Sequence, residues 1–157
     1  MLKKLLSIFK IVLLYTFIIS ISYAELIKPN DVIEPYQVVK IQLSGLKQND
    51  KPKKDNGIEQ TWEFAHPNNQ KNTGPLNQFK SMIKGDAYSM LLNHLDHKVV
   101  EVKSTDISVL FEVTVLDKNK AYYKFIWQVE KYTKEGPLKD CWLTTMVSKP
   151  EPLGSSI

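Results

Sequence analysis

The sequence predicts an α+β fold in which N-terminal helices pack on one face of a curved antiparallel sheet. Two observations predict it. Before residue 95, apolar residues recur every three or four positions, as they do along one face of a helix. After residue 95, apolar and polar residues alternate, as they do in strands with one buried face, and short polar turns separate these segments. Helices followed by strands in one small chain are typical of α+β domains.

The first 24 residues have the pattern of an export signal. A basic start precedes the uncharged stretch Ile11–Ala24, which ends in Ser-Tyr-Ala, with small residues at the −3 and −1 positions of a cut before Glu25. We therefore expect a signal peptide over 1–24 and an exported protein, periplasmic or secreted, that leaves the membrane after cleavage. The alternative is an uncleaved anchor, because Leu5–Ala24 is long enough to cross a bilayer, although Lys10 interrupts it.

The excess of basic charge belongs mostly to this leader. The chain has 21 basic residues, all lysine, and 17 acidic residues, which gives a net charge of +4. Three lysines and no acidic residue precede the expected cut, so the mature chain carries a net charge of +1. The lysines at 51, 53 and 54 lie without interleaved aromatic residues, as in a solvated loop. We therefore expect no nucleic-acid partner.

The first helix is expected to begin at Pro35. Proline lacks a backbone N–H, and at the first position of a helix that N–H would make no hydrogen bond within the helix. It carries one apolar stripe made of Tyr36, Val39, Leu43 and Leu46. A lysine-rich loop over 49–56 follows and is closed by Gly57.

Two shorter helices are expected next. One covers Ile58–His66 and stops before Pro67, since the residue before proline disfavours helical backbone. The polar segment 67–75 is expected to be a loop. The next helix opens at Thr73-Gly74-Pro75, ends at Gly85, and is followed by a short helical turn over 87–92; its apolar residues are Leu76, Phe79, Met82 and Ile83.

Four strands are expected in the second half. The two clearest cover 107–115 and 121–130, joined by the turn Asp117–Lys120, and each has one apolar face. Val99–Lys103 and Cys141–Ser148 complete the meander.

The expected domain covers residues 25–148. The remaining residues, 149–157, include two prolines, a glycine and two serines, and are expected to form a flexible tail. The single cysteine cannot form an internal disulfide, so stability must come from the core.

The apolar face of such a sheet, closed by helices, is expected to leave an aromatic interior that serves as a ligand-binding pocket. Tyr and Trp residues there need hydrogen-bond partners for their polar tips. The expected pocket residues are Trp62, Phe79, Phe111, Tyr123, Phe125, Trp127 and Trp142, with Phe64 beside them.

The run DNGIEQTWEFAHPNN over 55–69 resembles the signature of an uncharacterised nuclear-transport-factor-2-like family, known as domain of unknown function number 4864. VVKIQLSGLKQND before it, and NTGPL and DCWLT after it, fit in the same order and extend the resemblance over Pro35–Val147. The resemblance implies a cone-shaped α+β fold with a pocket. The wider superfamily includes isomerases, dehydratases, cyclases and non-catalytic binding or dimerising modules, so fold alone does not give function.

Asp55 and Glu59 are the first candidates for chemistry. They are four residues apart, and paired carboxylates can divide the roles of acid and base. The competing interpretation, which we favour, is that Asp55 caps the second helix and Glu59 supports its first turn.

The segment His94-Leu95-Asp96-His97 offers two imidazoles. In a strand, residues three apart point to opposite faces, so we expect no metal site, and His66 or Cys141 would be needed to complete one. His94, placed near the mouth of the pocket, is the better acid/base candidate, against a loop histidine with a packing or hydrogen-bonding role.

Cys141 would be a nucleophile only if a neighbouring histidine lowered its pKa. The interpretation that we favour is a small buried residue on a strand.

Two functions remain open from the sequence. One is a non-catalytic module that binds a small apolar ligand or another protein, with a homodimer formed through the sheet. The other is a small isomerase, dehydratase or hydrolase that uses an acid/base residue inside the cone. Glu112 and Glu130 fall on the polar faces of their strands, which favours the first. We expect no cofactor.

Overall fold

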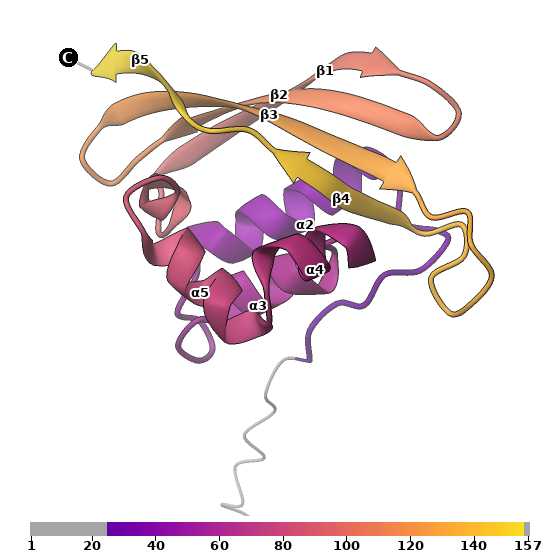
Figure 1. The fold of residues 1–157 in the computed structure, drawn as a ribbon. Coiled ribbons are helices and arrows are strands. Elements are labelled where there is room, and N and C mark those ends of the chain that lie inside the picture. Colours follow the sequence, from indigo (N-terminus) through magenta and orange to yellow (C-terminus); the bar gives the residue numbers. More distant parts are fainter. Residues whose placement is uncertain (1–24, 156–157) are drawn as a thin grey trace, which may run out of the picture.

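The computed structural model describes residues 25–155, so the expected signal peptide over 1–24 lies outside the described residues. Within these residues, four helices and a single-turn 3-10 helix precede five strands (Figure 1). The helices are α2 (Pro35–Lys47), α3 (Asn56–Glu63), α4 (Pro67–Thr73), α5 (Leu76–Lys84) and η1 (Ser89–Leu91). The strands are β1 (Asp96–Ser104), β2 (Ser108–Leu116), β3 (Ala121–Lys131), β4 (Trp142–Val147) and β5 (Glu151–Ser155).

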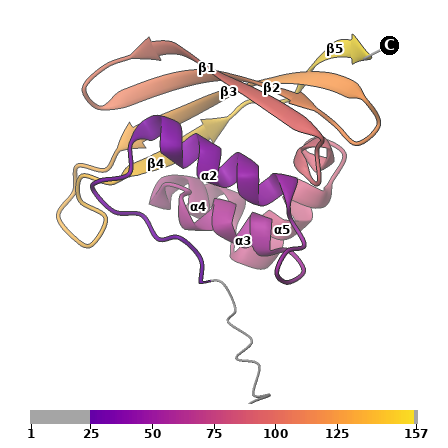
Figure 2. The ribbon, with the colours of Figure 1, turned by 180° about the vertical axis from the view of Figure 1, so that it is seen from behind.

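The predicted α+β architecture is confirmed. The strands form one curved antiparallel sheet in the order β1-β2-β3-β4, and the helices cover a single face of it (Figures 1 and 2). Helix α2 lies directly against the sheet, with α3 packed behind it (Figure 2). Among residues 25–155, no helix is long and apolar enough to cross a membrane.

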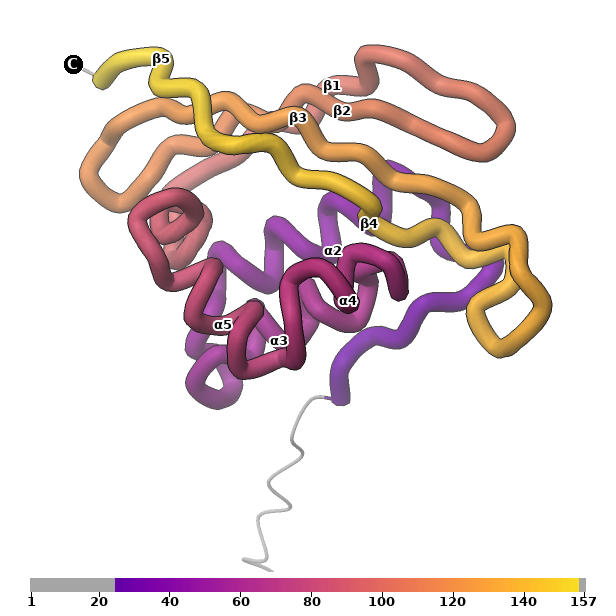
Figure 3. Tube along the Cα trace, in the orientation of Figure 1, coloured from indigo at the N-terminus to yellow at the C-terminus, as the bar shows by residue number. Residues whose placement is uncertain are grey.

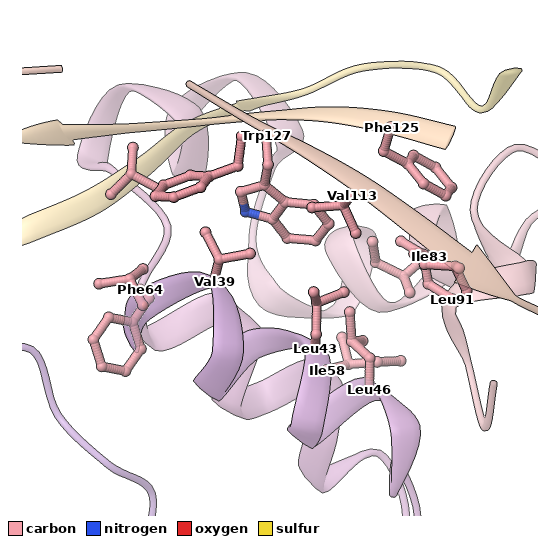
Figure 4. Packing of buried hydrophobic residues seen from close by; sticks show 14 of the residues in the cluster. Val39, Leu43, Leu46, Ile58, Phe64, Ile83, Leu91, Val113, Phe125 and Trp127 are labelled. Atoms are coloured by element: carbon pink, nitrogen blue, oxygen red, sulfur yellow. The ribbon is translucent and has the colours of Figure 1, made fainter. Parts of the chain in front are cut away.

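The core lies between α2 and the inward faces of β2 and β3. The period-2 pattern of both strands is reproduced, since Phe111 and Val113 are buried beside Phe125 and Trp127. Figure 4 shows Trp127 projecting from the sheet toward α2, above Val39 and Leu43. The sheet thus presents its largest buried side chain to the helix layer.

The expectation that 67–75 is a loop is wrong, because Pro67–Thr73 form helix α4. Pro67 occupies its first turn, and the His66 Nδ1 atom accepts a hydrogen bond from the Asn68 backbone N–H at 3.1 Å. An imidazole therefore takes the N-cap role that serine or aspartate more often has.

The expectation of a flexible C-terminal tail is also wrong. Instead of an irregular tail over 149–157, Glu151–Ser155 form β5, which pairs with β3 where β4 has ended (Figure 3). The Lys124 Nζ and Glu151 Oε2 atoms form an ion pair at 2.8 Å across this pairing. Pro152 is tolerated because β5 is an edge strand, where a missing N–H costs little.

Helices α2 and α3 approach each other through two glycines. A Cβ atom on Gly57 would lie 2.0 Å from the Gly45 carbonyl oxygen and 2.9 Å from the Asn49 Cα atom. A Cβ atom on Gly45 would find its nearest neighbours at 3.4 Å, an ordinary contact. The two positions therefore differ sharply in their tolerance of a methyl group.

We predict that Gly57→Ala lowers the free energy of unfolding by about 3 kcal/mol, because backbone atoms must move apart. Gly45→Ala, the matched control, is expected to raise it by about 0.5 kcal/mol, since alanine favours helix over glycine. Urea unfolding followed by tryptophan fluorescence measures both. Equal effects of the two substitutions would contradict this description of the helix contact.

Candidate functional site

A cavity of about 100 Å³ lies between the helices and the sheet. Residues from α2, α3, α4, α5, η1, β3 and β4 form its wall, which is apolar on most sides. The lining residues are Gln42, Leu46, Thr61, Ala65, Asn69, Thr73, Phe79, Met82, Ile83, Tyr88, Leu91, Trp127, Thr144 and Val147.

Two of the expected pocket residues, Phe79 and Trp127, line this cavity. The others lie elsewhere because the aromatic face of the sheet is filled by packing. Phe111 and Phe125 are fully buried in the core, as is Phe64. Trp62 packs on Phe79 with ring centroids 5.0 Å apart, Tyr123 lies half-buried beside the core, and Trp142 lies under the Lys131 ammonium group.

Gln42 forms a buried hydrogen-bond network at one wall of the cavity. Its Oε1 atom accepts from Trp127 Nε1 at 3.0 Å and from Thr144 Oγ1 at 2.7 Å. Its Nε2 atom donates to the Thr61 carbonyl oxygen at 3.0 Å. One side chain of α2 is thereby joined to α3, β3 and β4.

The partners of Gln42 fix the orientation of its amide. The indole N–H of Trp127 can only donate, so it must face the amide oxygen, and the Thr61 carbonyl can only accept, so it must face the nitrogen. Thr61 lies in the last turn of α3, where helix carbonyls lack partners within the helix. Gln42 therefore provides a hydrogen-bond partner for a carbonyl at the end of α3. It also provides one for the Trp127 indole N–H, which the sequence predicts to need a partner.

Sequence reasoning missed Gln42. A signal for it was present, because position 42 falls three residues after Val39 and four before Leu46, on the buried face of α2. A glutamine within an apolar stripe requires partners, and a tryptophan N–H on the opposing strand is one that fits.

Two hydrogen bonds join the helices to β4 beside the half-buried part of the cavity wall. Asn69 Nδ2 donates to the Thr144 carbonyl oxygen at 3.5 Å, and the Tyr88 hydroxyl donates to the Val147 carbonyl oxygen at 3.4 Å. Both distances are long for such bonds. These contacts are longer than those of the Gln42 network.

His94 and His97 meet outside the lining of the cavity. The left-handed backbone of Asn93 precedes them, and His94 comes before β1 begins, so the expectation that they point to opposite faces is wrong. The His94 Nε2 and His97 Nδ1 atoms are 2.8 Å apart, and His94 Nδ1 donates to the Leu91 carbonyl oxygen at 2.7 Å. His94 is buried, 2% exposed, rather than placed at a pocket mouth.

The surroundings of both imidazoles disfavour their positively charged form. Burial lowers the pKa of His94, and burial together with the adjacent His94 lowers the pKa of His97 to about 4. Lys40 and Lys47 of α2 oppose the charged form of His97, and Asp96 only partly offsets them. Within residues 25–155, no group of three or more His, Cys, Asp or Glu side chains is arranged to hold a metal ion.

Asp55 and Glu59 are held in separate ion pairs rather than facing each other. Lys84 Nζ lies 2.7 Å from Asp55 Oδ2 and holds the pKa of that carboxyl below its usual value. Lys53 and Lys80 do the same for the pKa of Glu59, at 2.6 and 2.8 Å.

The predicted capping role of Asp55 is corrected. Asp55 occupies the N-cap position of α3, but its side chain caps nothing; the Asn49 Oδ1 atom accepts from the Ile58 N–H at 3.1 Å instead. The Asp55 carboxylate bonds to the Lys84 ammonium group of α5 instead, and Asn49 takes the capping role.

Cys141 is buried, 2% exposed, immediately before β4. Burial raises the pKa of its thiol, which keeps it in the less nucleophilic form.

Comparisons with family models, curated proteins and solved structures return no match to this chain.

We predict that Gln42→Leu lowers the free energy of unfolding by about 3 kcal/mol, because it leaves the Thr61 carbonyl without its donor and weakens the pairing of Trp127. Gln48→Leu, at the exposed end of the same helix, is the control and is expected to change it by less than about 0.5 kcal/mol. Urea unfolding measures both. A similar small loss for both variants would contradict the importance of the network.

We predict that the free energy of unfolding falls as the pH drops from about 6.5 toward 4. Over this range the unfolded chain binds a proton at His97 that the folded chain excludes, so acid favours unfolding. His97→Gln, whose amide can still donate to His94, is expected to reduce the fall between pH 7 and pH 5. An unchanged fall in this variant would contradict the role given to His97.

Proposed function

We propose that this domain binds a small, largely apolar molecule in the cavity and does not transform it. One observation carries the proposal: the wall combines apolar side chains with a fixed polar group, and no Asp, Glu, His, Lys or Cys of residues 25–155 lines it. Apolar walls with a few oriented polar groups are typical of ligand-binding cavities. General acid–base chemistry requires a titratable group within reach of the ligand, and among the described residues of the lining only the Tyr88 phenol is one; its hydroxyl already donates to the Val147 carbonyl oxygen.

The volume limits the ligand. A cavity of about 150 Å³ with apolar walls holds a benzene molecule. The present cavity, about 100 Å³, has room for about four non-hydrogen atoms by the same measure. A longer molecule would extend past Asn69 and Tyr88, where the bonds to β4 are long.

The alternative, a small enzyme, finds less support in this geometry. His94 has both ring nitrogens engaged by Leu91 and His97, and Asp55 is paired with Lys84. These two residues and Cys141 lie outside the lining of the cavity. Any of these three residues would therefore have to act from outside the site that we describe.

The proposal includes the cellular context expected from the sequence. We propose export directed by residues 1–24, and membership of the nuclear-transport-factor-2-like family that the sequence resembles. Helices on one face of a curved open sheet support that family. We also propose a homodimer formed through the opposite face of the sheet, where Val100, Tyr122 and Met146 are exposed.

We predict that xenon under pressure shifts the methyl NMR signals of Leu46, Ile83 and Leu91, because xenon enters apolar cavities of this kind. Met82→Phe places a larger side chain in the cavity wall and is expected to reduce these shifts. Met146→Phe makes the same change on the outer face of β4 and is expected to leave them intact. Absence of xenon-induced shifts in the wild-type protein would contradict the proposed cavity.

A further inference from the structure

We propose that the ligand carries an uncharged oxygen, a carbonyl or hydroxyl group, which accepts a hydrogen bond from Gln42 Nε2. This inference rests on the proposed binding function and adds the chemical class of the ligand. Three observations lead to it: the hydrogen bonds that Gln42 leaves unmade, the free capacity of its neighbour Thr61, and the lack of charge in the cavity wall.

The Gln42 amide has one donor left over. Its oxygen already accepts two hydrogen bonds, from Trp127 and Thr144, and its nitrogen donates one hydrogen to the Thr61 carbonyl. An amide nitrogen has two hydrogens, and the second finds no acceptor among residues 25–155. Because Gln42 is 1% exposed, bulk water does not satisfy that hydrogen. Since Gln42 lines the cavity, a cavity molecule with an oxygen atom would satisfy it.

The orientation of this donor is locked. Rotating the amide by half a turn would direct its NH₂ group at the Trp127 N–H and its oxygen at the Thr61 carbonyl, placing two donors together and two acceptors together. The hydrogen bond that the amide still lacks is therefore one that it would donate. A ligand atom that only donates, such as an ammonium nitrogen, would have no partner in Gln42.

Thr61 adds a second polar atom to the same wall. Its hydroxyl donates to the Gly57 carbonyl oxygen at 2.8 Å, so its own oxygen remains able to accept. A ligand hydroxyl would accept from Gln42 and donate to Thr61, whereas a ketone would use Gln42 alone. The apolar end of either molecule would rest against Leu46, Phe79 and Ile83.

The ligand oxygen must be uncharged. No lysine or carboxylate of the described chain lines the cavity, so an ion there would lose its hydration without gaining a counter-charge. Carboxylates and amines charged at neutral pH are therefore excluded, and ketones, aldehydes and alcohols remain.

The test uses three probes with four non-hydrogen atoms each: acetone, n-butane and the acetate ion. They are added to the wild-type chain from Glu25 onward while NMR records the methyl signals of the cavity and the side-chain amide protons of Gln42. We expect acetone to shift both sets, with one Gln42 amide proton moving downfield. We expect n-butane to shift the methyl signals alone, and acetate to shift neither set.

The outcomes separate the inference from the proposed function. If acetone and n-butane both shift the methyl signals and neither moves the Gln42 protons downfield, the cavity binds ligands but the hydrogen bond is overturned. If acetate binds as tightly as acetone, the requirement for an uncharged oxygen is overturned. If neither acetone nor n-butane shifts any cavity signal, the proposed binding function itself fails.

Discussion

The hydrogen bonds of Gln42 are the constraint on which the rest of the structure depends. A single amide on α2 receives Trp127 from β3 and Thr144 from β4, and donates to the end of α3. Because all of these groups are buried, each lost partner would leave a polar atom without water. Apolar side chains can shift against one another, but a buried hydrogen-bond network with fixed donors and acceptors permits one arrangement of helix and sheet. The position of Trp127, and with it one wall of the cavity, follows from this network.

Thr144 extends the same constraint to α4. Its backbone accepts from His66 N–H at 2.9 Å and donates to the Phe64 carbonyl oxygen at 2.8 Å, so the chain entering α4 pairs with β4 at the residue that bonds Gln42. Asn69 then reaches back to the same carbonyl of Thr144. The segment that covers the cavity is thus tied to the network at its start. Farther along α4, Gln70 Nε2 donates to the Trp62 carbonyl oxygen at 3.0 Å and ties the segment to α3.

The sequence predicted the elements whose pattern is local. Period-2 alternation located β2 and β3, and the spacing of apolar residues located α2 and α5. It failed where distant partners decide the structure: α4 depends on His66 and on pairing with β4, and β5 depends on the edge of β3 left free where β4 ends. The prediction of the pocket residues failed for the same reason, since a list of aromatic residues does not say which of them fill the core. Phe111 and Phe125 are packed in the core, whereas the cavity lies beside Phe79 and Trp127.

The central claim is that the cavity holds a small neutral molecule in the protein's native setting. The most direct test is native mass spectrometry of the protein recovered from the exported fraction in which we propose that it resides, with gentle ionisation that preserves bound molecules. The account predicts a chain that begins at Glu25 and carries one small neutral adduct, which denaturing conditions release. A chain that repeatedly shows its bare mass, together with cavity methyl signals that no added probe shifts, would contradict it.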